Sequence, residues 1–213
     1  MQKILYRKVY EEAVFFIFMG NRSAELNTTR LGLRRWKESD LVPFRALNAD
    51  ARVMEFYPGT LSAQESDDIV RRAEKHFEAH GFGLFAVERK DKGEFIGFVG
   101  LQNVPFDAAF TPAVEIGWRI AFEQWNQGLA TEAAKAVLTF AREKLGLREV
   151  VALTYRGNQR SRRVMEKLGM IYDPGCDFDN PHPLLVESWL KPHVLYRTDW
   201  ASNSWPVGSR ESL

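Results

Sequence analysis

The stretch from residue 114 to residue 145 most constrains the fold of this chain, because its apolar pattern changes there from a two-residue period to a helical one. Over residues 114–120, apolar side chains alternate with Glu115, Gly117 and Arg119, which predicts a strand with one apolar face. Over residues 128–145, apolar residues recur three and four positions apart and Gly146 follows, which predicts a helix and its end. A strand joined to a helix by a short loop is typical of α/β proteins.

The flanking sequence predicts further elements in a mixed order. Two apolar runs, at residues 83–89 and 95–101, are separated by a Lys-Asp-Lys-Gly turn, which predicts a hairpin. Other helices are expected over residues 41–47, 62–80 and 158–168, and other strands over residues 31–36, 150–155, 170–172 and 184–198. We therefore predict an α/β fold with a mixed, partly antiparallel sheet flanked by helices, and not a doubly wound parallel sheet.

The length and composition predict one domain. The chain has 213 residues, of which 45% are hydrophobic and 27% charged, which suits one sizeable core and is short for two. We expect the domain over residues 27–200, after an extension over residues 1–26 and before a Ser- and Gly-rich tail over residues 201–213. The extension holds an apolar run at residues 13–19. This run is far shorter than the ~20 residues that span a bilayer, and no signal-peptide cleavage pattern follows it.

The charged and metal-ligating residues exclude several classes of function. The formal net charge is +1, so no broad attraction to nucleic acid or to an anionic membrane is expected. Cys176 is the one cysteine, which excludes a disulfide or a thiolate metal cage within the chain and favours a cytoplasmic location. His76 and His80 have the i, i+4 spacing of a helical metal site, but the zinc-protease pattern is absent. We predict a solvated helix face there and no metal.

The start of the helix at Gly128 has the features of a phosphate site. A helix N-terminus offers backbone N–H groups without partners and the positive end of the dipole. Gly128 and Ala130 are small enough to let a diphosphate approach, and Thr131 adds a hydroxyl donor. A tight strand-to-helix turn explains the same residues equally well. Neither the Gly-Lys-Ser/Thr loop of nucleoside triphosphatases nor the Gly-x-Gly-x-x-Gly loop of dinucleotide sites occurs.

Several motifs in register resemble the GNAT superfamily of acyl-CoA-dependent N-acyltransferases, in its ribosomal-protein N-terminal acetyltransferase-like branch. They are Glu-Ile-Gly-Trp at residues 115–118, Trp-Asn-Gln-Gly-Leu-Ala-Thr-Glu-Ala at 125–133, Asn158-x-x-Ser161, and Met-Glu-Lys-Leu-Gly-Met at 165–170. The resemblance covers roughly residues 29–200. It implies acetyl-coenzyme A as co-substrate and a sheet whose strands at 114–120 and 150–155 splay apart.

The same resemblance assigns the coenzyme contacts. The pantetheine arm would enter the gap and pair with the first of these strands, at Ile116 and Trp118. The pyrophosphate would rest on the N–H groups of the helix start. These are the amides of Gln127, Gly128, Leu129, Ala130 and Thr131.

Asn158 and three nearby arginines complete the expected coenzyme site. Asn158 is expected to cap its helix, and the resemblance adds contact with the pantetheine arm. One of Arg160, Arg162 and Arg163 would meet the 3′-phosphate, and we choose Arg163, leaving the other two on a solvated face. Trp125 stands where the family usually has Gln or Arg, which shifts phosphate binding further onto the backbone.

The catalytic assignments rest on the same motifs. Glu115 is the candidate general base, because it occupies the position of the base in some family members; a surface glutamate with water as base is the alternative. Many members use a late-helix Tyr to protonate the leaving thiolate, but Met165 stands there. Ser161 is the candidate replacement, and a simple helix cap is its alternative role. Cys176 has no histidine placed to make it an acetyl carrier.

These residues predict an N-acetyltransferase that transfers acetyl from acetyl-CoA to a primary amine by direct attack in a ternary complex. The amine would be a protein N-terminus or a small molecule, selected by the loops at residues 56–61 and 104–112. Phe56, Tyr57 and Trp118 are the expected walls of the acceptor site. A non-catalytic acyl-CoA-binding sensor or interaction module is the alternative, and the missing Tyr keeps it open. The sequence also leaves a homodimer open.

Overall fold

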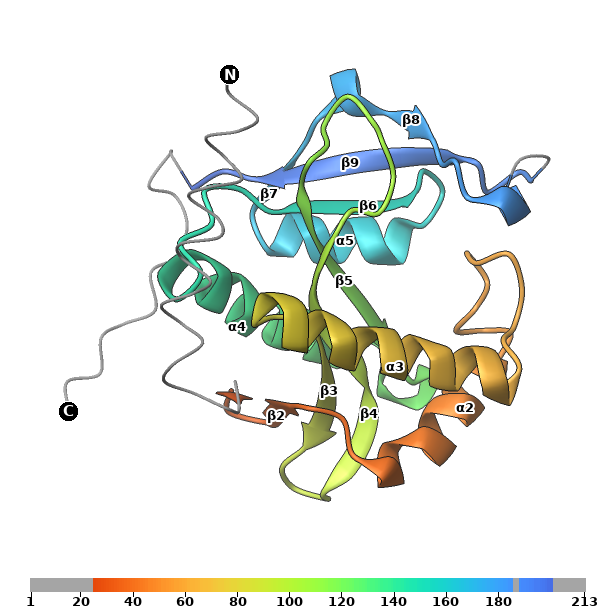
Figure 1. The fold of residues 1–213 in the computed structure, drawn as a ribbon, viewed down its shortest axis with the longest axis vertical. Helices are drawn as coiled ribbons and strands as arrows, with labels where there is room; N and C mark the ends of the chain where they lie inside the picture. Colours follow the sequence, from red (N-terminus) through yellow and green to blue (C-terminus); the bar gives the residue numbers. More distant parts are fainter. Residues whose placement is uncertain (1–24, 186–187, 201–213) are drawn as a thin grey trace.

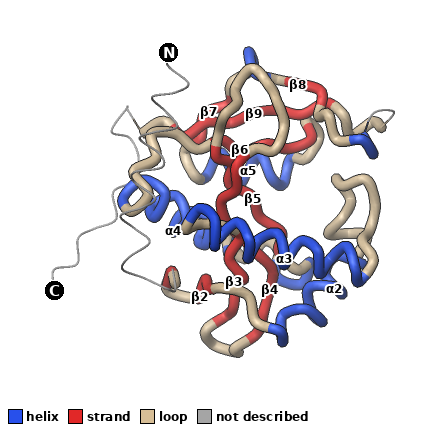
Figure 2. Tube along the Cα trace, viewed as in Figure 1, coloured by secondary structure: helices blue, strands red, loops and turns tan. Residues whose placement is uncertain are grey.

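In the computed structural model, residues 25–185 and 188–200 are described, and their strands form one sheet (Figures 1 and 2). Most of the predicted extension and all of the predicted tail lie outside these residues. The sheet order is β1-β2-β3-β4-β5-β6-β9-β7, with β8 paired to β9. The strands are β1 (Leu26–Asn27), β2 (Leu31–Arg34), β3 (Leu84–Arg89), β4 (Glu94–Asn103), β5 (Val114–Ile120), β6 (Val151–Tyr155), β7 (Met170–Tyr172), β8 (Phe178–Asp179) and β9 (Pro192–Thr198).

The sheet opens at its one parallel neighbour pair. All other neighbouring strands pair antiparallel, including the full length of β4 against β5. Strands β5 and β6 run parallel and pair only at Glu115 and Val151. Beyond that point the two strands part, so the edge of β5 toward β6 has no strand partner. The predicted mixed sheet with splayed strands is confirmed.

Within the described residues, four α-helices pack on the sheet, and local signals explain their bounds. They are α2 (Leu41–Ala49), α3 (Ala63–His80), α4 (Leu129–Glu143) and α5 (Gln159–Lys167). The side chain of Ser62 caps α3 by accepting from the amide of Glu65, and Gly81 ends the helix with a φ of 74°. Helix α4 packs against β4 and β5, and α5 packs against β6, β7 and α4 (Figure 1).

The main core lies between α4 and the sheet. The buried face of α4 consists of small and branched apolar side chains, which allow close approach to β4 and β5. Its members are Leu129, Ala133, Ala134, Val137, Leu138 and Ala141. A second cluster joins α2 and α3 to the β3–β4 hairpin through Phe44, Val70, Leu84 and Phe98. In the described part of the chain, no helix is long and apolar enough to cross a membrane.

Two predictions of detail were wrong. The last β region was expected to start near residue 184, but Pro183–Leu185 is a 3-10 turn and β9 starts at Pro192. Proline has no amide hydrogen to donate to a strand ladder, so Pro192 fits the first position of a strand and not its interior. His76 does not lie on a solvated face. It is half-buried, with Nδ1 2.7 Å from the carbonyl oxygen of Phe82, while its Nε2 accepts from the amide of Asn103 at 3.2 Å. Burial lowers the pKa of His76 below its usual value, so the neutral ring links α3 to β4.

Candidate active site

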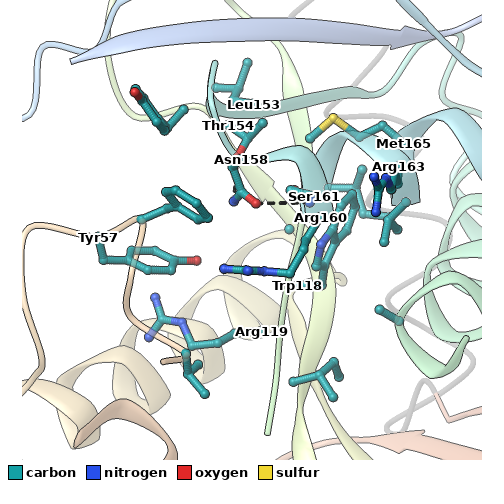
Figure 3. Close-up of a pocket in the computed structure, with 18 of the residues that line it drawn as sticks. Tyr57, Trp118, Arg119, Leu153, Thr154, Asn158, Arg160, Ser161, Arg163 and Met165 are labelled. Carbon is teal, nitrogen blue, oxygen red and sulfur yellow. Dashed lines mark hydrogen bonds between the residues drawn. The ribbon is translucent and has the colours of Figure 1, made fainter. Parts of the chain in front are cut away.

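A cavity of about 640 Å³ lies where β5 and β6 part (Figure 3). It is lined by residues of β5 and β6, the start of α4, the first turns of α5, and the loop between α2 and α3. Every predicted site residue except Gln127 lines it: Glu115, Ile116, Trp118, Gly128, Leu129, Ala130, Thr131, Asn158, Ser161 and Arg163. Stretches of the chain around residues 53–58, 115–131 and 153–167 therefore converge on one cavity.

The start of α4 presents free backbone amides to this cavity. The first helical hydrogen bond runs from the amide of Glu132 to the carbonyl of Gly128, at 3.0 Å. The amides of Leu129, Ala130 and Thr131 precede that bond, so they have no acceptor within the helix. Gly128 has a φ of 76°, a left-handed conformation that glycine adopts without strain. The helix dipole and these amides together favour an anion.

Gln127 lies at this turn but faces away from the cavity. Its side-chain Oε1 accepts from Nη1 of Arg89 at 3.1 Å, and its Nε2 donates to the carbonyl of Glu123 at 3.1 Å. The carbonyl of Gln127 accepts from Nη1 of Arg30 at 3.0 Å. Arg30 also binds Glu132, through Nε at 2.6 Å and through its backbone amide at 3.0 Å. These bonds hold the turn against β3 and against the residue that precedes β2.

Glu115 lies on β5 at the point where the strands part. Its Oε2 accepts from Nε2 of Gln102, the neighbour opposite it on β4, at 3.3 Å. No cation of the described residues forms an ion pair with it. Burial raises the pKa of Glu115 to about 7, and the bond from Gln102 lowers it by a smaller amount. The carboxyl group therefore exchanges a proton near neutral pH, as a general base requires.

The first turn of α5 closes the other side of the cavity (Figure 3). Oδ1 of Asn158 accepts from the amide of Ser161 at 3.1 Å, which confirms the predicted cap. Nδ2 of Asn158 donates to Oγ1 of Thr154 on β6, also at 3.1 Å. The hydroxyl of Ser161 lines the cavity and forms no hydrogen bond to a described residue. Met165 is buried but also borders the cavity, and it has no proton to donate.

The three arginines of α5 have different surroundings. Arg160 forms an ion pair with Glu55 and lies over the rings of Phe56 and Trp125. Arg162 donates to the hydroxyl of Tyr196 at 3.1 Å. Arg160 is exposed, as predicted, although it also lines the cavity. Arg162 is half-buried against the rings of Tyr172 and Tyr196, so the prediction of a solvated face was wrong for this residue. Arg163 lines the cavity, and within the described residues its guanidinium has no partner. It remains available to a phosphate.

The part of the cavity away from α4 has an aromatic wall. Phe56 and Tyr57 form it, and Tyr155 adds a ring that stacks on Phe56 at a centroid distance of 5.7 Å. Trp118 also lines the cavity, but it packs against the core that contains α4. Sequence reasoning missed several further lining residues: Gln102, Phe106, Arg119, Thr154, Tyr155, Asn180, His182 and His193. The alternation of β5 already put Arg119 on the face of Glu115, and this signal could have found it.

The described residues contain no group of three or more side chains placed to hold a metal ion. Cys176 is half-buried, and its Sγ accepts from Nη2 of Arg197 at 3.2 Å. It is not among the residues that line the cavity. The free amides, the unpaired arginine, the open strand edge and the carboxyl group of raised pKa fit an anionic thioester and a reacting nucleophile.

Comparisons with known proteins agree with this geometry. The family model described as Acetyltransferase (GNAT) domain matches residues 30–171. YkkB of Bacillus subtilis (strain 168) is 30% identical over 83% of this chain and 96% of its own length. The FsC-acetyl coenzyme A-N(2)-transacetylase of Aspergillus fumigatus is 31% identical over 56% of this chain and 53% of its own length.

Solved structures share the fold. An acetyltransferase from Agrobacterium tumefaciens str. C58 has a TM-score of 0.68 and 26% identity, covering 82% of this chain and 94% of its own. RimJ of Mycobacterium smegmatis, in complex with CoA-disulfide, has a TM-score of 0.65 at 18% identity, covering 84% of this chain and 79% of its own. The expected resemblance is thus confirmed: the chain belongs to the GNAT acetyltransferase family, whose common activity is acyl transfer from acetyl-coenzyme A.

Proposed function

We propose that this chain transfers the acetyl group of acetyl-CoA to a primary amine, in a complex that holds both substrates at once. The observation that carries the proposal is the carboxyl group of Glu115, which faces the cavity with a pKa near 7 at the point where β5 and β6 part. A primary amine is mostly protonated at neutral pH and must lose a proton before it attacks. The name of the Aspergillus relative, a coenzyme A N(2)-transacetylase, also supports a nitrogen acceptor.

The coenzyme is assigned to the α4 side of the cavity. The amides of Leu129, Ala130 and Thr131 would bind the pyrophosphate, because they have no hydrogen-bond acceptor within the helix. The pantetheine arm would lie along β5 at Ile116 and Trp118, where the strand edge has no partner. Arg163 would bind the 3′-phosphate of the coenzyme, and Asn158 would contact the pantetheine arm.

The reaction then needs only residues that line the same cavity. The amine nitrogen attacks the thioester carbonyl, so that a C–N bond forms, the C–S bond breaks and the sulfur leaves as a thiolate. The carboxylate of Glu115 takes the proton from nitrogen, directly or through water. The thiolate takes up a proton that the nitrogen loses after attack, and the hydroxyl of Ser161 would donate a hydrogen bond to the sulfur. Met165 leaves the position of the family's usual Tyr without a donor.

Replacing Glu115 with Gln tests the proposal. Between about pH 7 and the pKa of the amine, wild-type turnover should exceed that of Glu115→Gln by about 10²-fold. The difference should shrink at high pH, because the amine is already neutral there, and below pH 7, because Glu115 is then protonated. Release of free thiol from acetyl-CoA measures turnover across pH, and calorimetry checks that the variant still binds coenzyme. A ratio that stays constant across pH would remove Glu115 as the base.

A non-catalytic acyl-CoA sensor predicts a different result. Such a protein would bind acetyl-CoA but release no thiol with any amine, and the buried Met165 is the feature that favours it. A panel of small amines and of peptides with free N-termini separates the two functions. Thiol release with at least one amine supports the transferase. Mass spectrometry of peptides from a cell extract, after incubation with labelled acetyl-CoA, would then separate protein N-termini from small molecules as acceptors.

A further inference from the structure

Arg119, on β5, is a buried cation whose charge no carboxylate of the described residues neutralises. The residue is 8% exposed and lines the cavity. Its Nη1 donates to Oδ1 of Asn48 at 2.5 Å, and its Nε is buried without an acceptor among the described residues. Asn48 is neutral, and its own Nδ2 donates to Ser66. Buried charges in proteins are normally paired, so Arg119 lacks the partner that its burial calls for.

The carboxylates of the neighbouring loop are already paired elsewhere. Glu55 pairs with Arg160, and Asp50 pairs with Arg52. The only ring directly over the guanidinium from this loop is that of Tyr57, whose centroid lies 4.2 Å from Cζ of Arg119 (Figure 3). An aromatic face offsets part of a positive charge but does not replace an anion. The loop therefore covers Arg119 without neutralising it.

Arg119 and Glu115 share one face of β5, with Gly117 between them. Their Cα atoms are four residues apart, or about 13 Å along a strand. Gly117 has no side chain, and a Cβ built on it would meet no atom within 4 Å. The face thus presents a carboxyl group at one end, a guanidinium at the other and open space between them. That arrangement complements a molecule that carries an amine and an anion.

We propose that Arg119 binds a carboxylate of the acceptor, so that the substrate class is an amine that also carries a carboxylate. This inference rests on the proposed amine acetyltransferase function and names its acceptor class. The planar guanidinium suits a planar carboxylate, and a charge-assisted bond in a closed site is stronger than one between neutral groups. The amine end lies toward Glu115 and the carboxylate end toward Arg119. The rings of Phe56 and Tyr57 contact the connecting part of the molecule.

The test compares acceptors that differ only in the anion. Amino carboxylates of increasing chain length, free amino acids and short acidic peptides are assayed beside the matching carboxamides, by thiol release from acetyl-CoA. For wild type, kcat/KM of the best carboxylate acceptor should exceed that of its amide by about ten- to hundredfold. Arg119→Gln should remove this preference, because KM for the carboxylate should rise about ten- to hundredfold more than KM for the amide. Arg119→Lys should restore part of the preference.

Two controls separate recognition from a structural role of Arg119. Arg45→Gln removes an arginine that pairs with Asp67 outside the cavity, and it should leave the carboxylate-to-amide ratio as in wild type. Simple carboxylates without an amine should inhibit wild type competitively with the acceptor, a measurement that needs no variant. Equal use of carboxylate and amide by wild type, or an equal loss for both in Arg119→Gln, would overturn the inference while the amine transferase stands. Failure of every amine to release thiol would instead overturn the proposed function.

Discussion

The carboxyl group of Glu115 links the chemistry of the cavity to the stability of the fold. Burial raises its pKa from the ordinary 4.5 to about 7. Between these two values the folded protein holds a proton that the unfolded chain has lost, so the free energy of unfolding falls as pH rises through this window. Above pH 7 the cost of the buried charge is fully present. A carboxylate kept for catalysis thus destabilises the protein at the pH where it acts.

We therefore expect Glu115→Gln to stabilise the protein at pH 8 and to leave its stability unchanged at pH 4. The gain at pH 8 should be about 3 kcal/mol, since the pKa rises from 4.5 to about 7 and each pKa unit corresponds to about 1.4 kcal/mol. Urea unfolding at the two pH values measures it. Glu78→Gln, on the exposed face of α3, serves as the control and should show no such pH dependence. An equal effect of Glu115→Gln at both pH values would mean that packing, and not the charge, is responsible.

At the residue scale, the sequence predicted which side chains of β5 carry reactive or charged groups better than it predicted which residues cover them. The alternation over β5 put Glu115 and Arg119 on the polar face, and the structure has them there. The same alternation does not say what covers that face. Tyr57 and Asn48, more than 60 residues away in sequence, make Arg119 a buried cation. A periodic pattern contains no information on such contacts, so it could place Arg119 on the face of Glu115 but could not show that Arg119 is a buried cation.

At the scale of elements, the start of α4 combines a backbone requirement with a binding role. Gly128 has a φ of 76°, and a Cβ there would come no closer than 3.8 Å to Nη2 of Arg30. Space is therefore available, but the left-handed conformation costs a residue with a side chain about 1 kcal/mol. Gly128→Ala should destabilise the fold by about that amount and also weaken acetyl-CoA binding, because the helix start shifts to relieve the strain.

Gly146 provides the matched control for this prediction. Its φ is 63°, nothing lies within 4 Å of a Cβ built on it, and it is not among the residues that line the cavity. Gly146→Ala should lose similar stability, about 1 kcal/mol, yet bind acetyl-CoA as wild type does. Thermal unfolding and calorimetry measure the two effects separately. Equal coenzyme affinity in both variants would show that the geometry at Gly128 does not contribute to binding.

Elements with strong local signals were predicted well. Helix α3 was expected over residues 62–80 and spans Ala63–His80, because a capping box at Ser62 and Glu65 and the left-handed Gly81 fix its ends over a few residues of sequence. The two-residue strands β1 and β8 were not predicted, since they form only by pairing with β2 and β9. Gln127 was grouped with the other residues of the helix start. Its carbonyl binds Arg30, its side chain binds Arg89, and it is not among the residues that line the cavity, so the phosphate contact of its amide stays a prediction.

At the scale of the whole molecule, the decisive feature is a sheet in two parts. Strands β1–β5 and strands β6–β9 meet at a single residue pair, Glu115 with Val151. Packing between α4 and α5, in one continuous core, holds the two parts together. Apolar periodicity could predict the strands but not this gap, because it does not specify which strands pair. The expectation of splayed strands came from the family resemblance alone.

The gap predicts how the coenzyme should change the dynamics of the protein. Amides of β5 that point toward β6 have no strand partner beyond Glu115, so they should exchange their hydrogens faster than amides of the fully paired β3. Coenzyme A at about 100 times its Kd stabilises the whole fold by about 2.7 kcal/mol. Exchange that requires global unfolding should therefore slow throughout the core.

Local protection should appear in addition, at the edge of β5 and at the start of α4. Hydrogen exchange with mass spectrometry, with and without coenzyme A, should show the largest slowing in peptides that cover residues 116–120 and 128–131, and a smaller one in β3. Gly128→Ala at the same coenzyme concentration should lose part of this local protection, and Gly146→Ala should keep it. If protection were uniform across the sheet, the arm would not lie along β5, and the gap between β5 and β6 would need another explanation.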